Sequence, residues 1–159
     1  MDKVFHFQLD SVIGAYRSDA VAVYCFDDRF TLVVQKFLKR LRLERVDTIR
    51  VAGGARALAS PDGEPEKNFL LEQLRLSRKL HDTGRVILIA HSDCGACGGL
   101  ARFNHDAVAE AEHHRGELAR AAAYVRSAIP EVEVECFFAD FFGVWRVETA
   151  RSAGSDQLA

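Results

Sequence analysis

Short apolar runs alternate along the chain with longer stretches in which apolar and polar residues recur at helical spacing. Three of the runs are rich in valine or isoleucine, and they cover residues 20–27, 45–55 and 85–91. The second run ends in a glycine turn and the third ends in a histidine. Near-continuous apolar runs of this length are typical of strands buried in a parallel sheet. The pattern therefore predicts three buried strands.

Two amphipathic helices are expected between these strands. In residues 29–43 one apolar stripe recurs at helical spacing, made of Leu32, Val33, Phe37, Leu38 and Leu41. Residues 60–67 carry two of the three prolines, which predicts a loop there. In residues 68–84 the buried stripe should contain Leu70, Leu74 and Ser77, and Gly84 should end the helix.

The last part of the chain predicts one more helix and one or two more strands. Residues 105–129 are rich in alanine and should be helical, with a break near Gly116 and an end at Pro130. Residues 131–148 begin with alternating glutamate and valine, a pattern that places one face of a strand in solvent. Gly143 is the point at which this segment would bend if it forms two strands.

Strands that alternate with helices of this length indicate an α/β fold. We expect a single domain over residues 1–149, with a mainly parallel central sheet of about four strands flanked by helices. The last edge strand could be antiparallel. Residues 150–159 are expected to form a flexible tail.

The segment 131–148 becomes strongly aromatic after its first residues. Its aromatic residues are Phe137, Phe138, Phe141, Phe142 and Trp145. Aromatic surface near a sheet edge belongs either to the core or to a subunit interface, and the sequence does not choose between them. If this surface is an interface, the protein is a homodimer or a larger homo-oligomer, and this is the state that we expect.

Composition excludes some classes of protein. The chain has 159 residues, of which 48% are hydrophobic, and a net charge of −2. This size and apolar content suit one folded domain, and the mixed charges give no reason to expect a nucleic-acid partner. No apolar run is long enough for a membrane helix and no secretory signal is visible, so we expect a cytoplasmic protein without a membrane partner. In that compartment the four cysteines are expected to be thiols or metal ligands.

Metal-binding residue types stand where two of the predicted strands end. Cys25 lies near the end of the first strand, and His91 ends the third strand with Cys94 three residues later. Ligands in open α/β sheets bind outside the carboxyl ends of the strands. If the two strands are adjacent, two thiolates and one imidazole converge on one point. This is a tetrahedral zinc set with one open position, as in catalytic rather than structural sites.

These motifs resemble those of the β-class carbonic anhydrases. That family has Cys-x-Asp-x-Arg at one strand end and His-x-x-Cys at another, and this chain has "CFDDR" at 25–29 and "HSDCG" at 91–95. Here "RVAGGA" at 50–55 stands in the place of a glycine-rich turn of the family, and "FFGVWRVET" at 141–149 resembles its closing strand. The resemblance covers most of residues 20–149.

The resemblance implies reversible hydration of carbon dioxide to bicarbonate by a zinc-bound hydroxide. Zn²⁺ would be held by Cys25, His91 and Cys94. Asp27 would accept a hydrogen bond from the nucleophile, Arg29 would pair with Asp27, and the Gly53–Gly54 turn would bring backbone close to the substrate pocket. Relatives with the same site that hydrolyse carbonyl sulfide or carbon disulfide are an alternative.

Other functions for these residues stay open. The fold could bind zinc without catalysis, as a regulatory module. Cys94 and Cys97 form Cys-Gly-Ala-Cys, which would suit a redox disulfide if the bond before Pro130 were cis.

The remaining cysteine and several histidines are expected to play no chemical part. Cys136 is expected to be a core residue. His105, His113 and His114 lie in a charged helical stretch and are expected at the surface.

Overall fold

The computed structural model describes residues 14–60 and 64–149 of the chain. The expected flexible tail at 150–159 lies outside the described residues, as do residues 1–13 and 61–63. The strands are β1 (Ala20–Cys25), β2 (Val46–Val51), β3 (Arg85–His91), β4 (Glu133–Ala139) and β5 (Val144–Val147). The helices are α1 (Thr31–Arg40), α2 (Pro65–His81) and α3 (Ala107–Ala128). Short 3-10 turns are η1 (Asp28–Phe30), η2 (Gly54–Ala59), η3 (Gly95–Cys97) and η4 (Leu100–Phe103).

The five strands form one sheet in the order β2-β1-β3-β4-β5. All neighbouring strands are parallel except β4 and β5, which pair antiparallel. This confirms the expected α/β fold and the antiparallel edge strand. The sheet has one strand more than expected, because the segment 131–148 forms two strands joined by a hairpin at Gly143.

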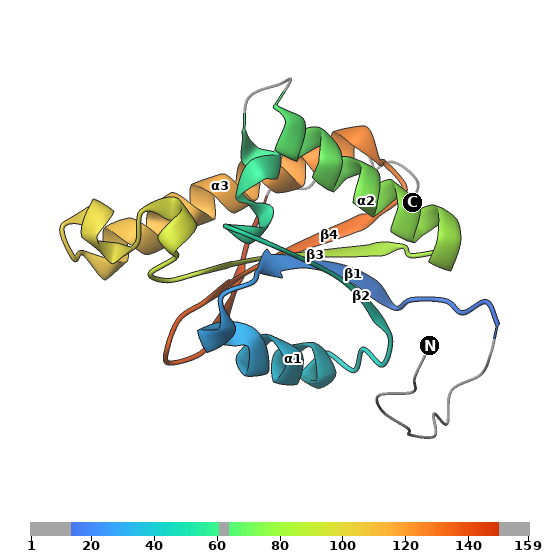
Figure 1. The fold of residues 1–159 in the computed structure, drawn as a ribbon, viewed down its shortest axis with the longest axis horizontal. Helices are drawn as coiled ribbons and strands as arrows, with labels where there is room; N and C mark the ends of the chain where they lie inside the picture. The colour runs from blue at the N-terminus through green and yellow to red at the C-terminus, as the bar shows by residue number, and fades with distance from the viewer. Residues whose placement is uncertain (1–13, 61–63, 150–159) are drawn as a thin grey trace, which may run out of the picture.

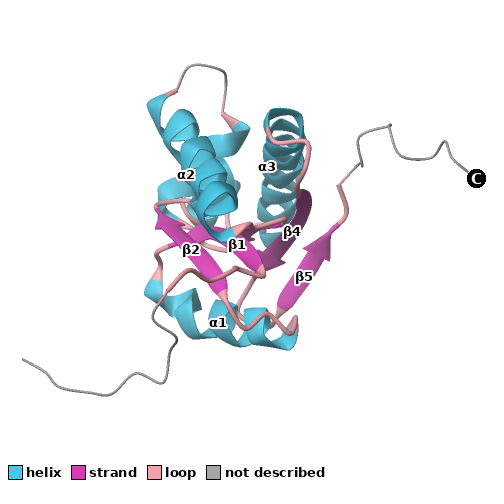
Figure 2. Cartoon of the chain, turned by 90° about the vertical axis from the view of Figure 1, so that its right-hand side faces the viewer, coloured by secondary structure: helices cyan, strands magenta, loops and turns pink. Residues whose placement is uncertain are grey.

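Helices cover both faces of the sheet. Figure 2 shows α1 on one side and α2 with α3 on the other, and Figure 1 shows the same layers from a second direction. Because successive side chains of a strand point to opposite faces, Val21 and Val23 of β1 join the core under α2 and α3. Ala22 and Tyr24 join the core under α1. Burial on both faces explains why the central strands β1 and β3 are almost entirely apolar.

Helix α3 is unbroken, so the expected break near Gly116 is wrong. A glycine inside a helix costs only about 1 kcal/mol relative to alanine. The alanine-rich remainder of α3 and its contacts with the sheet outweigh that cost. None of the described helices, α3 included, combines the length and the apolar character that crossing a membrane requires.

Two other local predictions were inaccurate. Helix α2 begins at Pro65, inside the segment expected to be a loop, because proline fits the first turn of a helix. In α1 the buried positions include Val34 and Leu38, whereas Leu32 is 66% exposed although it was placed on the apolar stripe. The stripe is displaced because the preceding turn η1 ends with Phe30 buried under the sheet.

The aromatic segment is divided between core and surface. Phe137 and Phe138 of β4 are buried, whereas Phe141, Phe142 and Trp145 in or beside the β4–β5 hairpin are exposed. Phe142 is 94% exposed. The β4 part of this segment therefore belongs to the core, and the part at the hairpin is exposed surface, where an interface with another subunit could form.

Candidate metal centre

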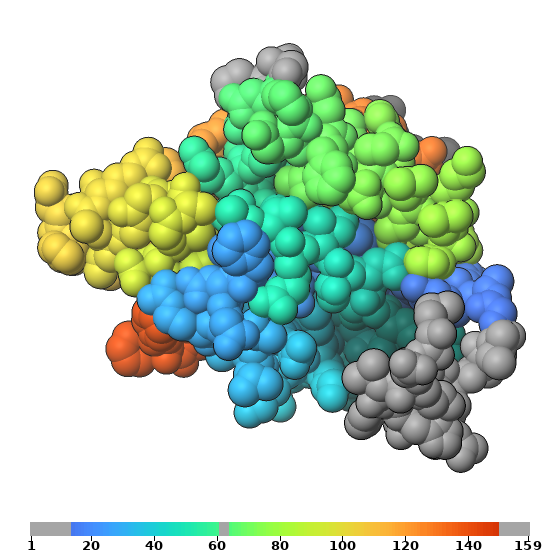
Figure 3. Space-filling view, in the orientation of Figure 1, coloured from blue at the N-terminus to red at the C-terminus, as the bar shows by residue number. Residues whose placement is uncertain are grey.

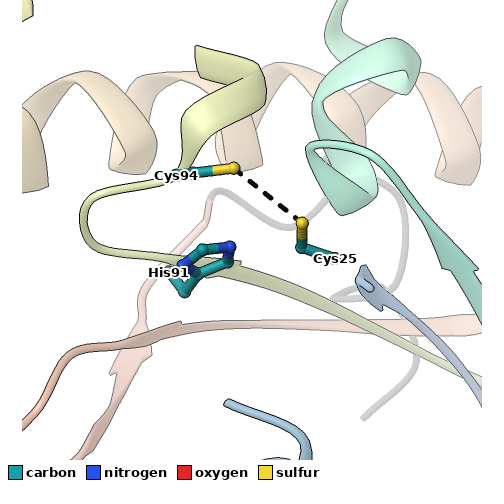
Figure 4. Close-up of side chains that lie close together, drawn as sticks. All are labelled: Cys25, His91 and Cys94. Carbon is teal, nitrogen blue, oxygen red and sulfur yellow. Dashed lines mark hydrogen bonds between the residues drawn. The ribbon is translucent and has the colours of Figure 1, made fainter. Parts of the chain in front are cut away.

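The carboxyl ends of β1 and β3 lie side by side, and they bring the three predicted ligands together. β1 pairs in parallel with β3, as the sequence argument required. Figure 4 shows Cys25, His91 and Cys94 directed toward one another. The Sγ atoms of Cys25 and Cys94 lie 3.9 Å apart. One ligand atom from each of the three side chains lies within 4.8 Å of the others. In the space-filling view the segments after β1, β2 and β3 meet on one side of the molecule (Figure 3).

A glycine at position 54 allows the turn after β2 to pack against Cys25. Gly54 has φ +57°, and a Cβ there would lie 2.9 Å from the backbone nitrogen of Cys25. Gly53 has φ +72° but more space around it. The nearest neighbour of a Cβ there would be the Ala96 side chain, at 3.4 Å. The backbone therefore approaches the site as closely as expected, and Gly54 is the residue that the approach requires. A direct role of either glycine in a substrate pocket stays a prediction.

Cys94 does not stand at the start of an α-helix. It precedes the 3-10 turn η3, and its carbonyl accepts a hydrogen bond from the Cys97 backbone at 2.9 Å. Such a short turn has little dipole, so helix-end electrostatics do not lower the pKa of this thiol. Instead, a hydrogen bond between the Cys94 and Cys97 side chains, together with burial, raises the pKa of Cys94 to about 11.

Burial likewise raises the pKa of Cys25. Without a cation both thiols therefore hold their protons at neutral pH. Metal coordination requires the thiolates, so a bound metal ion would displace these protons. By itself the buried site therefore does not stabilise the thiolates, whereas a bound cation would.

His91 has one ring nitrogen in use and one without a partner. Its Nδ1 lies 2.8 Å from the backbone oxygen of Ser92, and the ring packs 4.4 Å from the Phe30 ring, centroid to centroid. An Nδ1–H donated to that carbonyl leaves Nε2 with an unshared lone pair. Nε2 is buried and has no hydrogen-bond partner. An orientation fixed through Nδ1 with Nε2 vacant is the usual state of a histidine that ligates metal.

These atoms fit a zinc ion. Two sulfurs at about 2.3 Å from a tetrahedral zinc lie about 3.8 Å apart, close to the 3.9 Å between Cys25 and Cys94. Two thiolates and an imidazole are ligands that zinc prefers. Three protein ligands leave a fourth position for water or substrate.

Asp27 and Arg29 form the ion pair that the sequence predicted. The Arg29 Nη2 lies 2.7 Å from Asp27 Oδ2, and its Nε donates to Oδ1 at 3.0 Å. The backbone N–H of Arg29 also donates to Oδ1, at 3.1 Å. These hydrogen bonds lower the pKa of Asp27 to about 2 and move the pKa of Arg29 further above its usual value. The Asp27 carboxylate is therefore ionised and held beside the cysteine and histidine cluster.

Arg29 has a second acidic partner that sequence reasoning missed. Its Nη1 lies 2.9 Å from Asp93 Oδ2, and its Nη2 donates to the Asp93 carbonyl at 3.0 Å. The backbone N–H of Asp93 donates in turn to Glu110 of α3 at 2.7 Å. Asp93 has φ +50°, a conformation that aspartate tolerates better than most residues. An acidic residue between His91 and Cys94 was the available signal.

Two other predictions about single residues are corrected. His105 is exposed as expected, but His113 is half-buried, and His114 is only 1% exposed and lies close to Cys97. His114 is buried because α3 packs this side chain against Phe138 of the sheet. The redox interpretation loses support, because no cis peptide bond occurs in the described residues, Pro130 included. Cys136 is a core residue, as predicted.

Comparison with known proteins gives one matching family. The family described as "Putative carbonic anhydrase" matches residues 16–151. No curated protein matches the chain. The family match spans all five strands and includes every residue of the candidate metal centre.

Several solved structures are similar in fold. A carbonic anhydrase from Streptococcus mutans has a TM-score of 0.57 at 16% identity, with 84% of each chain covered. A carbon disulfide hydrolase has a TM-score of 0.54 at 12% identity, with 91% of this chain and 86% of that chain covered. One of two tetrameric β-carbonic anhydrases from Sordaria macrospora has a TM-score of 0.50 at 16% identity, covering 87% of this chain and 84% of that chain. At these identities the likeness shows the fold.

Proposed function

Because the chain belongs to the family described as putative carbonic anhydrases, and its fold is that of β-carbonic anhydrases, we propose that it catalyses the reversible hydration of carbon dioxide to bicarbonate. The metal would be zinc, held by Cys25, His91 and Cys94. When bound, zinc would supply a Lewis acid that activates a water molecule for attack on the substrate carbon.

Asp27 and Arg29 would orient the reacting water. A carboxylate is an acceptor only, so Asp27 would accept one hydrogen bond from the water and fix where its lone pair points. Arg29 keeps that carboxylate ionised and holds it in place through its paired N–H groups. Because the pKa of Asp27 is about 2, this role would persist throughout the neutral range.

One observation carries the proposal. The buried Nε2 of His91 has no hydrogen-bond partner, and it belongs to a cluster in which two cysteine Sγ atoms lie 3.9 Å apart. A buried polar atom left without a partner costs about 1–3 kcal/mol. A zinc ion would remove that cost and would accept all three ligands at ordinary bond lengths.

Stopped-flow hydration of carbon dioxide with a pH indicator tests the proposal. We expect zinc-loaded protein to accelerate the reaction. Asp27→Asn should lower kcat/KM about a hundredfold, or about 2.7 kcal/mol, with zinc content unchanged. Asp28→Asn, at the exposed neighbouring position, is the matched control and should have little effect. Zinc-loaded protein no faster than buffer would contradict the proposal and leave a non-catalytic zinc protein.

A hydrolase of carbon disulfide or carbonyl sulfide is the second candidate. It is favoured by the similarity in fold to a carbon disulfide hydrolase. The same three ligands would serve either reaction, so substrates must separate them. We expect carbon dioxide to be turned over and the sulfur compounds to be turned over at least about tenfold more slowly; release of hydrogen sulfide at the faster rate would reverse the assignment.

We also propose that the protein is a homodimer or a larger homo-oligomer. The exposed aromatic side chains of the β4–β5 hairpin support this, and one similar structure is described as tetrameric. Light scattering coupled to size exclusion should give a multiple of the 17.7 kDa chain mass. Phe142→Asp should shift the protein toward monomer, whereas Leu80→Asp, at an exposed leucine of α2, should not. A monomer at micromolar concentration would contradict the proposal.

A further inference from the structure

A second group of metal-binding side chains lies beside the candidate metal centre. It consists of Cys97 from η3 with His114 and Glu117 from α3, and is called the second cluster below. One ligand atom from each of these side chains lies within 4.8 Å of the others. Cys97 is also in contact with Cys25 and Cys94, so the two groups share a boundary. Neither the proposed reaction nor its ion pair uses the second cluster.

The second cluster is deeply buried. Cys97 is 4% exposed, His114 is 1% exposed, and the side chain of Glu117 is 13% exposed. A second carboxylate, that of Glu110, is buried close by. In the described residues the ion pairs of Glu110 and Glu117 are formed with histidines alone. An imidazole carries charge only when protonated, and the permanent charge of Arg56 acts on Glu117 more weakly than the two histidines do.

The spacing of the ligand atoms suits coordination. His114 Nδ1 lies 3.3 Å from Glu117 Oε2. Nitrogen and oxygen ligands bound 2.0–2.1 Å from a tetrahedral zinc ion lie about 3.3 Å apart. The other ring nitrogen of His114, Nε2, has no hydrogen-bond partner and lies 4.0 Å from Glu110 Oε1. With Nδ1 on a cation, Nε2 would carry the proton and face a carboxylate, the arrangement that orients many metal-bound histidines.

We propose that Cys97, His114 and Glu117 bind a second divalent transition-metal ion, of which zinc fits best. One thiolate, one imidazole and one carboxylate are all zinc ligands, and the thiolate argues against calcium or magnesium. His113 supplies a candidate fourth ligand, since its Nε2 is buried without a hydrogen-bond partner and lies 3.4 Å from Glu117 Oε1. The ion would join η3 to α3, and so would anchor the turn that follows Cys94.

Cobalt binding in a variant without the first centre tests the proposal. Cys25→Ser with Cys94→Ser removes both thiols of that centre and leaves Cys97 and Cys136 as the remaining cysteines. We expect titration with Co²⁺ to give a thiolate-to-cobalt charge-transfer band that saturates at about one ion per chain. Adding Cys97→Ser should abolish the band. Adding Cys136→Ser, the matched control at a buried cysteine of β4, should leave it unchanged.

A band that is absent from the double variant, or that survives Cys97→Ser, would overturn the second site. Native mass spectrometry of the otherwise unchanged protein covers the case in which the double variant does not fold. Zinc-loaded protein should carry about two ions per chain, and Glu117→Gln should carry about one. The control Glu112→Gln, an exposed position on the same helix, should keep two. A single ion per chain in the unchanged protein would refute the second site and leave the first intact.

Discussion

Histidines stand in polar clusters at both ends of the central sheet, and only one of these clusters is complete by itself. At the amino end, Asp47 of β2 accepts hydrogen bonds from Ser18 at 2.7 Å and from Ser77 at 2.6 Å, and it lies 2.7 Å from His81 Nδ1. At the carboxyl end, His91 Nε2 is buried without a partner between two thiols. The same residue type is satisfied in one place and unsatisfied in the other.

The difference is the one expected between a structural cluster and a binding site. Buried polar groups normally find partners within the protein, as they do around Asp47. The polar groups of a binding site must instead keep some hydrogen-bonding or coordinating atoms free for the ligand. Hydrogen bonds therefore explain the amino end completely, whereas at the carboxyl end the proposed cation would supply the partner that His91 lacks. Each of the following variants should affect one end and spare the other.

Removing a ligand of the metal centre should have the largest effect. Cys94→Ser should abolish stoichiometric zinc binding and lower kcat/KM for carbon dioxide at least about a thousandfold, or about 4 kcal/mol. Far-UV circular dichroism should stay native, because Cys94 lies outside the strands and helices of the sheet layers. Elemental analysis with stopped-flow kinetics measures both. Full activity in this variant would disprove the assignment of Cys94 as a ligand.

Gly54→Ala should destabilise the fold next to the metal centre. A Cβ at this position would lie 2.9 Å from Cys25 N and 3.0 Å from Tyr24 C, both backbone atoms that cannot move aside. We expect the free energy of unfolding to fall by about 3 kcal/mol. Gly53→Ala has the same unfavourable φ sign but ordinary contacts, so it should cost about 1 kcal/mol. Urea unfolding of both variants gives the comparison, and equal losses would contradict the packing argument.

Asp47→Ala should weaken the amino end alone. It leaves Ser77 and His81 without their acceptor, which should cost about 2 kcal/mol of stability. Zinc content should be unchanged. If zinc were lost as well, the two ends could not be treated as independent.

The Asp47 cluster should also give stability a pH dependence in the acid range. Burial opposes ionisation of Asp47, but hydrogen bonds from Ser77, His81 and Ser18 outweigh it, so the pKa lies below its usual value. A depressed folded-state pKa stabilises the protein above the unfolded value of about 4. That stabilisation is lost as pH falls through the folded pKa. Comparing unfolding curves of the unchanged protein and Asp47→Ala should show the two converging at low pH.

The smallest effect is expected from the second partner of Arg29. The Arg29 and Asp93 side chains are 46% and 42% exposed, and ion pairs exposed to solvent contribute little. Asp93→Asn should therefore lower kcat/KM only about threefold, against about a hundredfold for Asp27→Asn. Asparagine also tolerates the positive φ of this position. Asp27 and Asp93 share only Arg29 as a partner in this ion pair. Equal losses of activity in the two variants would therefore indicate that the position of Arg29, and not the Asp27 carboxylate itself, controls the reaction.

Much of this architecture could be predicted from the sequence, because each prediction rested on a local pattern. The apolar runs at 20–27 and 85–91 contain β1 and β3, and the rule for ligands at carboxyl ends then joined Cys25 to His91 across a long stretch of chain. The partner of Arg29 at Asp93 was missed because it depends on a left-handed turn that the sequence does not display.

His114 was misplaced for a different reason. Its neighbours along the helix are charged, which favours a surface position. Its burial is decided by tertiary packing against Phe138 and Cys97, which come from other elements. Helical spacing does place His114 on one stripe with Leu118 and Ala121, but that stripe also contains Glu110, so the polar character of its first turns concealed that it is buried.

Anomalous X-ray diffraction at the zinc edge, from crystals of protein purified without chelator, tests the central claim most directly. We expect a peak bounded by Cys25, His91 and Cys94, at about 2.3 Å from each sulfur and about 2.0–2.1 Å from His91 Nε2. Crystals that contain zinc but show no peak within about 3 Å of those three atoms would contradict it.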